Sequence, residues 1–193
     1  MNALLSYDKT LFLWFNNHLA SPWLDPIFYF LNCLGNGWVL AIITGVSLWL
    51  YQPRIFEKHW MWMMIAMLLS GLVVVLIKDW VGRPRPLATL APLIQAGKVH
   101  IHNIGPALKA RSFPSGHTQT AFAVATYLAL VFRRAAPIFI LIASLVGLAR
   151  IYAGVHYPLD VLVGAAIGSS FSIAMWLWRE KKLHKEKPPT GEI

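Results

Sequence analysis

Residues 60–77 read WMWMMIAMLLSGLVVVLI, an uncharged run that continues directly into KDWVGRPRP at 78–86. At about 1.5 Å per residue, an apolar helix of this length with small flanks crosses a hydrocarbon core of roughly 30 Å. The run therefore predicts a transmembrane helix. The basic, proline-rich segment after it predicts an abrupt exit into a charged surface layer.

The composition of the whole chain also indicates a membrane protein. Of its 193 residues 57% are hydrophobic and 13% are charged, whereas soluble globular proteins carry roughly 25% charged residues. The net charge of +9 then favours anionic lipid head groups and phosphate esters as partners, and not nucleic acid. The single cysteine, Cys33, excludes an internal disulfide scaffold and leaves the redox compartment undefined.

Four further apolar runs predict transmembrane helices, at residues 37–51, 117–132, 135–149 and 161–178. Residues 23–34 form a shorter run, which is either a separate helix or a kinked extension of the next one. The expected fold is therefore all-α: a polytopic membrane helix bundle with five transmembrane helices and one additional short helix. We expect a single domain over residues 1–193.

The N-terminal segment, residues 1–22, lacks the basic start of a signal peptide. Phe12, Phe15 and Leu19 share one helical face, which predicts an amphipathic helix lying in the membrane interface. The sequence shows no nucleic-acid-binding tail and no low-complexity segment.

The segment at residues 87–112 is too polar to cross a membrane and predicts an outer loop. We expect this loop to contact the substrate head group as a lid, with an ordinary surface loop as the alternative. His100 and His102 lie within it, but two histidines without further ligands are weak evidence for a metal. We therefore expect no metal site.

The charges at the other ends of the helices predict an orientation. The C-terminal tail at 179–193 is strongly basic, and Arg133 and Arg134 occupy the turn between the third and fourth predicted spans. The positive-inside rule places both on the cytoplasmic side. Arg54 and Lys58, in the turn before the second span, share that side, whereas Lys78, Arg83, Arg85, Arg111 and Arg150 lie at or near span ends on the outer face. This predicts a multi-pass plasma-membrane protein, in a bacterial inner membrane, with its site on the periplasmic face.

The segment at residues 111–117, RSFPSGH, reads as a helix N-terminus. Ser115 is a plausible N-cap, and the free N–H groups after it attract anions. Gly116 allows close approach to the backbone, and His117 follows directly. A capped helix start without a ligand is the alternative reading of this segment.

The segment at residues 150–160, RIYAGVHYPLD, is more specific. His156 and Asp160 are four residues apart, so one helical turn places them on the same face. A carboxylate can hold one imidazole nitrogen as N–H and leave the other free as a nucleophile. Arg150 ends an apolar span and needs an anionic partner. An ordinary His–Asp hydrogen bond at a helix start is the alternative.

The segment at residues 78–86 supplies further cations, of which Lys78 and Arg85 are the main candidates for phosphate binding. Arg83 and, in the outer loop, Arg111 are secondary candidates for contact with the substrate. Snorkelling of these long side chains to the membrane surface is the alternative.

Two histidines, one carboxylate, several cations and a helix N-terminus together suit the binding and attack of a phosphate. Carboxylates are too few for a two-metal cage. The inventory therefore predicts phosphoryl transfer without a metal or any other cofactor.

The spacing Lys-x6-Arg-Pro, then Pro-Ser-Gly-His, then Arg-x5-His-x3-Asp resembles the type 2 phosphatidic acid phosphatase superfamily, which shares its site with vanadium-dependent haloperoxidases. The resemblance covers roughly residues 60–178. One position departs from the family pattern, because Ala149 stands where the family usually has serine. We expect that change to tune activity and not to abolish it.

The resemblance implies that His156 attacks phosphorus and forms a phosphohistidine, that Asp160 orients it, and that His117 protonates the leaving oxygen. It further implies that the phosphate oxygens are held by Lys78, Arg85, Ser115, Gly116 and Arg150.

The predicted function is a lipid phosphatase acting on a phosphomonoester or pyrophosphate head group. The substrate classes considered are undecaprenyl pyrophosphate, phosphatidylglycerol phosphate, phosphatidic acid, diacylglycerol pyrophosphate and lipid A 1-phosphate. The alternative is a lipid phosphotransferase in which a lipid acceptor replaces water. A non-enzymatic lipid-binding protein with a vestigial site is disfavoured, because all the motif residues that carry the chemistry are present.

Overall fold

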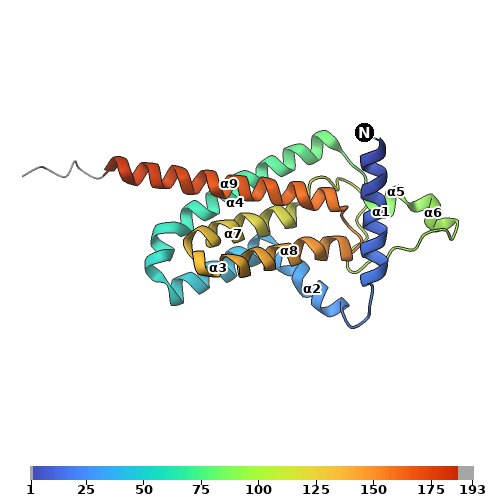
Figure 1. Cartoon of the computed structure of the whole chain (residues 1–193), viewed down its shortest axis with the longest axis horizontal. Coiled ribbons are helices and arrows are strands. Elements are labelled where there is room, and N and C mark those ends of the chain that lie inside the picture. Colours follow the sequence, from blue (N-terminus) through green and yellow to red (C-terminus); the bar gives the residue numbers. More distant parts are fainter. Residues whose placement is uncertain (1, 187–193) are drawn as a thin grey trace, which may run out of the picture.

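The computed structural model describes residues 2–186, and within that range every regular element is a helix (Figure 1). The prediction of an all-α fold is confirmed. The elements in chain order are α1 (Asn2–Leu19), α2 (Asp25–Leu34), α3 (Gly37–Tyr51), α4 (Pro53–Val81), α5 (Pro86–Thr89), α6 (Ala91–Gln95), α7 (Gly116–Val131), the 3-10 turn η1 (Arg133–Ala135), α8 (Ala136–Tyr152) and α9 (Pro158–Glu186).

Helix α7 is the centre of the bundle and packs against α9, α8 and α4. Its close approach to α9 depends on two small residues one turn apart on α9, Gly164 and Gly168. A methyl group at position 164 would meet the carbonyl oxygen of Ser115, and one at position 168 would collide with the carbonyl oxygen of Gln119. The glycines therefore let the two backbones touch, which fixes the start of α7 beside the start of α9.

Within residues 2–186, three helical segments are long and apolar enough to cross a membrane, in Pro53–Gln95, Arg133–Tyr152 and Pro158–Leu183. Up to four spans result if α2 and α3, which are bent by 77°, form one broken span. The prediction of five spans is therefore not confirmed. The predicted helices exist, but α3 has 15 residues and α7 has 16. At 1.5 Å per residue these lengths give only about 22–24 Å, less than the hydrocarbon thickness.

Residues 23–34, which the sequence left open as a helix or an extension, contain a separate helix, α2. The chain turns at Gly35, and Asn36 caps α3 by accepting hydrogen bonds from the backbone N–H groups of Trp38 and Val39. The bend places the end of α2 against α7, as described below for His117.

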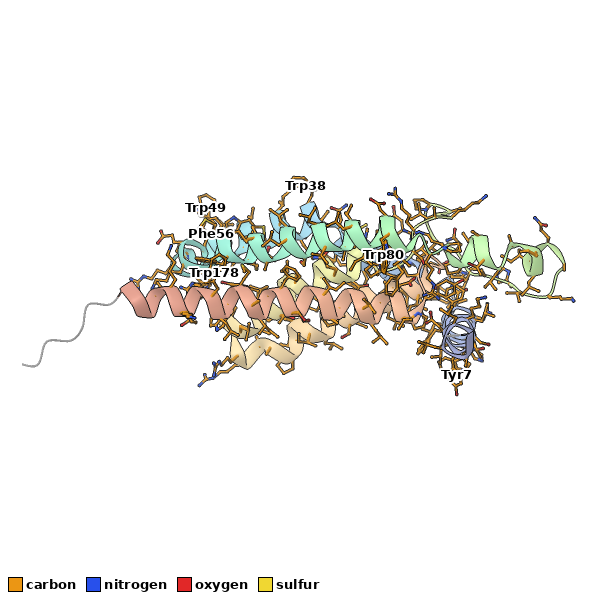
Figure 2. All side chains as sticks on the ribbon, turned by 90° about the horizontal axis from the view of Figure 1, so that it is seen from above. Tyr7, Trp38, Trp49, Phe56, Trp80 and Trp178 are labelled. Carbon is orange, nitrogen blue, oxygen red and sulfur yellow. The ribbon has the colours of Figure 1, made fainter. Side chains whose placement is uncertain are left out.

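The outer surface of the bundle is apolar, as expected of a chain surrounded by lipid. Exposed side chains include Leu68, Leu76 and Leu162, each more than half exposed. Figure 2 shows Trp49 and Trp178 near one end of the bundle and Trp80 toward the other. Tryptophan is enriched at both membrane–water interfaces, so this distribution agrees with helices that span a bilayer.

Helix α1 lies across one end of the bundle, nearly perpendicular to the long helices (Figures 1 and 2). The predicted apolar face is confirmed: Phe12 is fully buried, and Phe15 and Leu19 pack against the buried clusters beside it. Its position in the membrane interface remains a prediction.

The C-terminal segment differs from a free basic tail, because α9 continues without a break to Glu186. Arg179 is buried in this extension and donates from Nε to the carbonyl oxygen of Lys58 at 3.0 Å. The end of the predicted tail, residues 187–193, lies outside the described residues.

Candidate active site

Three chain segments meet at the end of the bundle that α1 covers. The first leaves α4 at Gly82, whose positive φ of 58° ends the helix and turns the chain toward α5. The second is the N-terminus of α7. The third is the turn between α8 and α9, in which Val155 and His156 donate backbone hydrogen bonds to the carbonyl oxygen of Arg150. All predicted site residues lie in or beside these segments.

His156 and Asp160 form the buried centre of the site, with exposed fractions of 2% and 0%. The Nδ1 atom of His156 is 3.3 Å from Oδ2 of Asp160, and Nε2 is 3.3 Å from Nη1 of Arg85. Arginine carries only donors, so Nε2 must present its lone pair. The proton therefore sits on Nδ1 and is donated to Asp160. The predicted pairing of His156 with Asp160 is confirmed, in the tautomer that a nucleophile at Nε2 requires.

Burial, followed by the positive charges of Arg150 and Arg85, lowers the pKa of His156 well below its usual value. The imidazole is therefore neutral at physiological pH. A neutral imidazole keeps a lone pair on one ring nitrogen, which a protonated ring lacks.

Arg85 is held rigidly beside His156. Its Nε donates to the carbonyl oxygen of Ala110 at 2.8 Å, and its Nη1 donates to the carbonyl oxygen of Val155 at 3.0 Å. These bonds tie the outer loop to the α8–α9 turn. They also fix the guanidinium within reach of any group attached to Nε2 of His156.

Arg150 is 8% exposed and donates from Nη1 to Oδ1 of Asn32 in α2 at 2.6 Å. Its Nε is buried and has no hydrogen-bond partner among the described residues. A buried guanidinium donor without a partner is energetically costly. A phosphate oxygen would satisfy it.

Ser115 caps α7, as predicted: its hydroxyl oxygen accepts from Oγ1 of Thr118 at 2.9 Å and from the Thr118 N–H at 3.4 Å. The backbone N–H of Ser115 donates to the carbonyl oxygen of Asp160 at 2.9 Å. The N-terminus of α7, where the N–H groups of Gly116 and His117 precede the first intrahelical bond, is thereby attached to the start of α9.

His117 lies in the first turn of α7, beside the end of α2. A methyl group on Gly35 would come within 2.7 Å of Cβ of His117. Helix α2 therefore packs directly on the second histidine, as it does on Arg150 through Asn32.

The side chain of Lys78 is hydrogen-bonded to the backbone of Arg111: Nζ of Lys78 donates to the carbonyl oxygen of Arg111 at 2.9 Å. The side chain of Arg111 is 63% exposed and pairs with Asp79 at 2.7 Å. Lys78 thus faces the site, whereas the Arg111 guanidinium points to an exposed carboxylate beside it.

Arg83 does not stand free for a substrate. Its two terminal nitrogens each lie 2.7 Å from a carboxylate, one from Asp8 in α1 and one from Asp160. Asp8 and Asn32 belong to no motif that the sequence reveals. The only signal for Asp8 is its place on the buried Phe12 face of α1, one turn before Phe12.

Two cavities adjoin the site, and Lys78 lines both. One, of about 750 Å³, lies under residues 107–111 of the outer loop and is also lined by Arg85. The other, of about 640 Å³, runs between α3, α4 and α7 beside His117, with an apolar wall that includes Met67, Leu68 and Leu72. Lys78 therefore lies in the wall of both cavities, the first of which has mostly charged side chains beside it and the second mostly apolar ones.

The histidine pair of the outer loop shows no metal-like arrangement. His102 lies 2.7 Å from Asp25 in α2 through Nε2, and Tyr152 donates to the same carboxylate. Among the described residues no three histidine, cysteine or carboxylate side chains are grouped as metal ligands. His102 anchors the loop to α2.

Comparison with known proteins identifies the family to which the chain belongs. Residues 59–184 match the family model described as PAP2 superfamily. The lipid A 1-phosphatase of Rhizobium johnstonii is 34% identical over 120 residues, which cover 58% of this chain and 44% of that protein. The match thus spans less than half of the length of this curated relative.

Two solved structures resemble the fold. The crystal structure of Aquifex aeolicus LpxE is 34% identical, with a TM-score of 0.73, over 87% of this chain and 93% of that one. A PAP2 type phosphatidylglycerolphosphate phosphatase from Bacillus subtilis gives a TM-score of 0.75 at 24% identity, over 94% and 88%. The second likeness concerns the fold alone. Because the family model covers the long helices and all three site segments, this chain belongs to the PAP2 superfamily.

Proposed function

We propose that this membrane protein is a lipid phosphatase that works through a phosphohistidine on His156. The observation that carries the proposal is the pair of contacts made by the ring of His156, from which its tautomer follows. Its Nδ1–H is directed to Asp160, and its Nε2 lone pair faces the guanidinium of Arg85. A lone pair directed at a cation suits a nucleophile whose target is an anion held by that cation.

The proposed reaction has two displacements. In the first, Nε2 of His156 forms a bond to phosphorus while the bond from phosphorus to the lipid oxygen breaks, and His117 donates a proton to that oxygen. In the second, water attacks phosphorus, the P–N bond breaks, and His117 accepts the proton from the water. Asp160 stabilises the positive charge that forms on His156 in both steps.

The proposed phosphate contacts are Lys78, Arg85, Arg150 and the N-terminus of α7 at Ser115 and Gly116. The unpaired Nε of Arg150 supports its role. Donors fixed before the substrate arrives stabilise the charge that develops in the transition state, typically by about 3 kcal/mol for each donor.

The two cavities that share Lys78 in their walls support a lipid and not a small soluble ester. The head group would occupy the charged cavity under residues 107–111, and the hydrocarbon chain would follow the apolar cavity beside His117. This placement gives the outer loop its proposed contact with the head group. The relative named lipid A 1-phosphatase favours a lipid 1-phosphate among the candidates, with undecaprenyl pyrophosphate, phosphatidylglycerol phosphate and phosphatidic acid beside it.

The proposed orientation places this end of the bundle on the outer, periplasmic face. The basic turn at Arg133 and Arg134 lies between α7 and α8, at the end of α7 remote from His117. The positive-inside rule assigns that turn to the cytoplasm.

The test is phosphate release by purified protein in detergent with EDTA present, across a panel of lipid phosphates and pyrophosphates. We expect release from at least one lipid that persists in EDTA and is lost in His156→Ala. Loss of release on chelation would contradict the metal-free mechanism. Turnover by folded His156→Ala at the wild-type rate would contradict the assigned nucleophile. Adding an acceptor lipid separates the phosphotransferase alternative, because the label would then appear on the acceptor and not in free phosphate.

A further inference from the structure

Helix α1 presents a buried stripe toward the site, formed by residues spaced four apart. Asp8 and Asn16 are buried polar side chains, and fully buried Phe12 lies between them. Phe12 packs edge-on against Tyr157, with ring centroids 5.4 Å apart. A buried carboxylate is costly unless it is paired, so the partners of Asp8 decide what this helix does.

Both carboxylate oxygens of Asp8 are used on the catalytic segments. Oδ2 lies 2.7 Å from Nη2 of Arg83, and Oδ1 accepts the backbone N–H of Leu159 at 2.9 Å. Leu159 precedes Asp160. One side chain of α1 thus holds both the turn in which Asp160 sits and the arginine that touches it.

Arg83 connects the two carboxylates. Its Nη1 donates to Oδ1 of Asp160 at 2.7 Å, and its guanidinium carbon lies 4.0 Å above the ring of Tyr157. The planar guanidinium donates in fixed directions. The position of Asp8 therefore determines where Arg83 meets Asp160.

The other oxygen of Asp160 faces the proposed nucleophile. Oδ2 accepts the backbone N–H of Tyr157 at 2.9 Å and lies 3.3 Å from Nδ1 of His156. With Arg83 fixing Oδ1, the carboxylate cannot rotate away from the imidazole. Without Asp8, Arg83 would keep only one carboxylate partner and would be free to turn toward a bound phosphate.

We propose that Asp8 and Arg83 are positioning residues for the proposed phosphatase reaction, acting together to hold Asp160 against His156. The inference rests on the proposed function. It gives Arg83 a role different from the predicted substrate contact, because each of its terminal nitrogens is paired with a carboxylate and its side chain is only 13% exposed. It also gives α1, which lies outside the residues that match the family model, a direct effect on the site.

The test compares Asp8→Asn with Asn16→Ala in the full chain, measuring kcat, KM and the melting temperature in detergent. Asn16 is the matched control: it anchors the same helix through the carbonyl groups of His102 and Tyr152 and has no contact with Asp160. We expect Asp8→Asn to lower kcat per folded molecule on the order of tenfold to a hundredfold with KM nearly unchanged, the range known for outer partners of metal ligands. Asn16→Ala should lower the melting temperature and keep kcat per folded molecule.

Two further variants keep the test decisive if Asp8→Asn does not fold. Asp8→Glu retains the carboxylate and should recover part of kcat. Arg83→Lys retains one positive charge above Tyr157, but an ammonium cannot donate in the arginine's fixed fork to both carboxylates. In the double variant, the fold-losses of kcat caused by Arg83→Lys and by Asp8→Glu should not multiply, because both changes act on the same contact between Asp8 and Arg83.

Wild-type kcat in folded Asp8→Asn or Arg83→Lys would overturn the inference, as would equal losses in Asp8→Asn and Asn16→Ala. A marked rise in KM with kcat preserved would also overturn it, since that pattern belongs to a substrate contact. An inactive wild-type protein on every lipid would contradict the proposed function, whereas active wild type with an equally active Asp8→Asn would contradict the inference alone.

Discussion

One histidine at each end of the bundle provides a direct comparison, His156 buried and His59 partly buried. At the α1 end His156 contacts Asp160 and Arg85. At the opposite end His59 stacks on Trp176, with ring centroids 5.4 Å apart, and lies edge-on to Tyr127. The Nδ1 of His59 and the hydroxyl of Tyr127 are buried without a partner among the described residues.

The buried arginines of the two ends differ in the same way. Arg150 and Arg179 are each 8% exposed. Arg179 has two partners close to it: it donates to the carbonyl oxygen of Lys58 and pairs with the carboxylate of Glu180. Arg150 instead lies among cations from other segments and keeps an unpaired donor. Both ends of the bundle therefore bury polar residues. What distinguishes the site end is that several positive charges lie around Arg150, whose Nε has no hydrogen-bond partner among the described residues.

The largest expected effect is a difference in turnover between substitutions of the two histidines. His156→Ala should lower turnover on the order of 10⁴-fold or more, because it removes the attacking atom. His59→Ala should leave turnover per folded molecule near the wild-type value. Initial rates on the best lipid substrate, normalised to folded protein, measure both. Comparable losses in the two variants would remove the distinction between a catalytic and a packed histidine.

The next effect separates the two arginines. Arg150→Gln should lower kcat/KM roughly a hundredfold or more, as expected when one preorganised donor to a developing anion is lost. Arg179→Gln should act on thermal stability and not on turnover per folded molecule. Steady-state kinetics and thermal melts of both variants give the comparison. A purely thermal effect of Arg150→Gln would make Arg150 a second structural arginine.

A smaller effect concerns pH and stability. The lowered pKa of His156 means that the unfolded chain binds a proton more readily than the folded one. The free energy of unfolding should therefore fall as the pH drops below about 6.5, by at most about 1.4 kcal/mol per pH unit for this group. Thermal melts from pH 7 to pH 5 should show a weaker decline in His156→Gln than in wild type. Identical slopes would mean that His156 is not held neutral by the fold.

The smallest effect is expected at the opposite end. His59→Phe keeps a ring against Trp176 and removes the unpaired Nδ1 atom. The free energy of unfolding should change by less than about 1 kcal/mol in either direction, since stacking is kept and a polar burial cost is lost. A large destabilisation in chemical denaturation would show that His59 makes a polar contact essential to the fold.

Features of the fold and the site that depend on residues close together in the chain were predicted from the sequence. The helices, the Ser115 cap and the pairing of His156 with Asp160 each follow from residues within one turn of each other. The predicted number of five spans is not confirmed, because α3 and α7, with 15 and 16 residues, are shorter than a helix that crosses a hydrocarbon core alone.

The contacts that position the site could not be predicted in the same way. Asp8 meets Arg83 across 75 residues, and Asn32 meets Arg150 across 118. Such pairs leave no periodic pattern in the chain, because only the tertiary packing of α1 and α2 across the bundle brings them together. The two carboxylate partners of Arg83 were likewise not predicted, and its contact with the substrate stays a prediction.

The central claim, nucleophilic attack by His156, is tested most directly by trapping the phosphoenzyme. Protein mixed with a lipid carrying a labelled terminal phosphate is quenched in alkali, where phosphohistidine is stable, and its peptides are sequenced. The account predicts label on Nε2 of His156, formed within one turnover and absent from His156→Ala. Label on any other residue, or the same labelled peptide from His156→Ala, would contradict it.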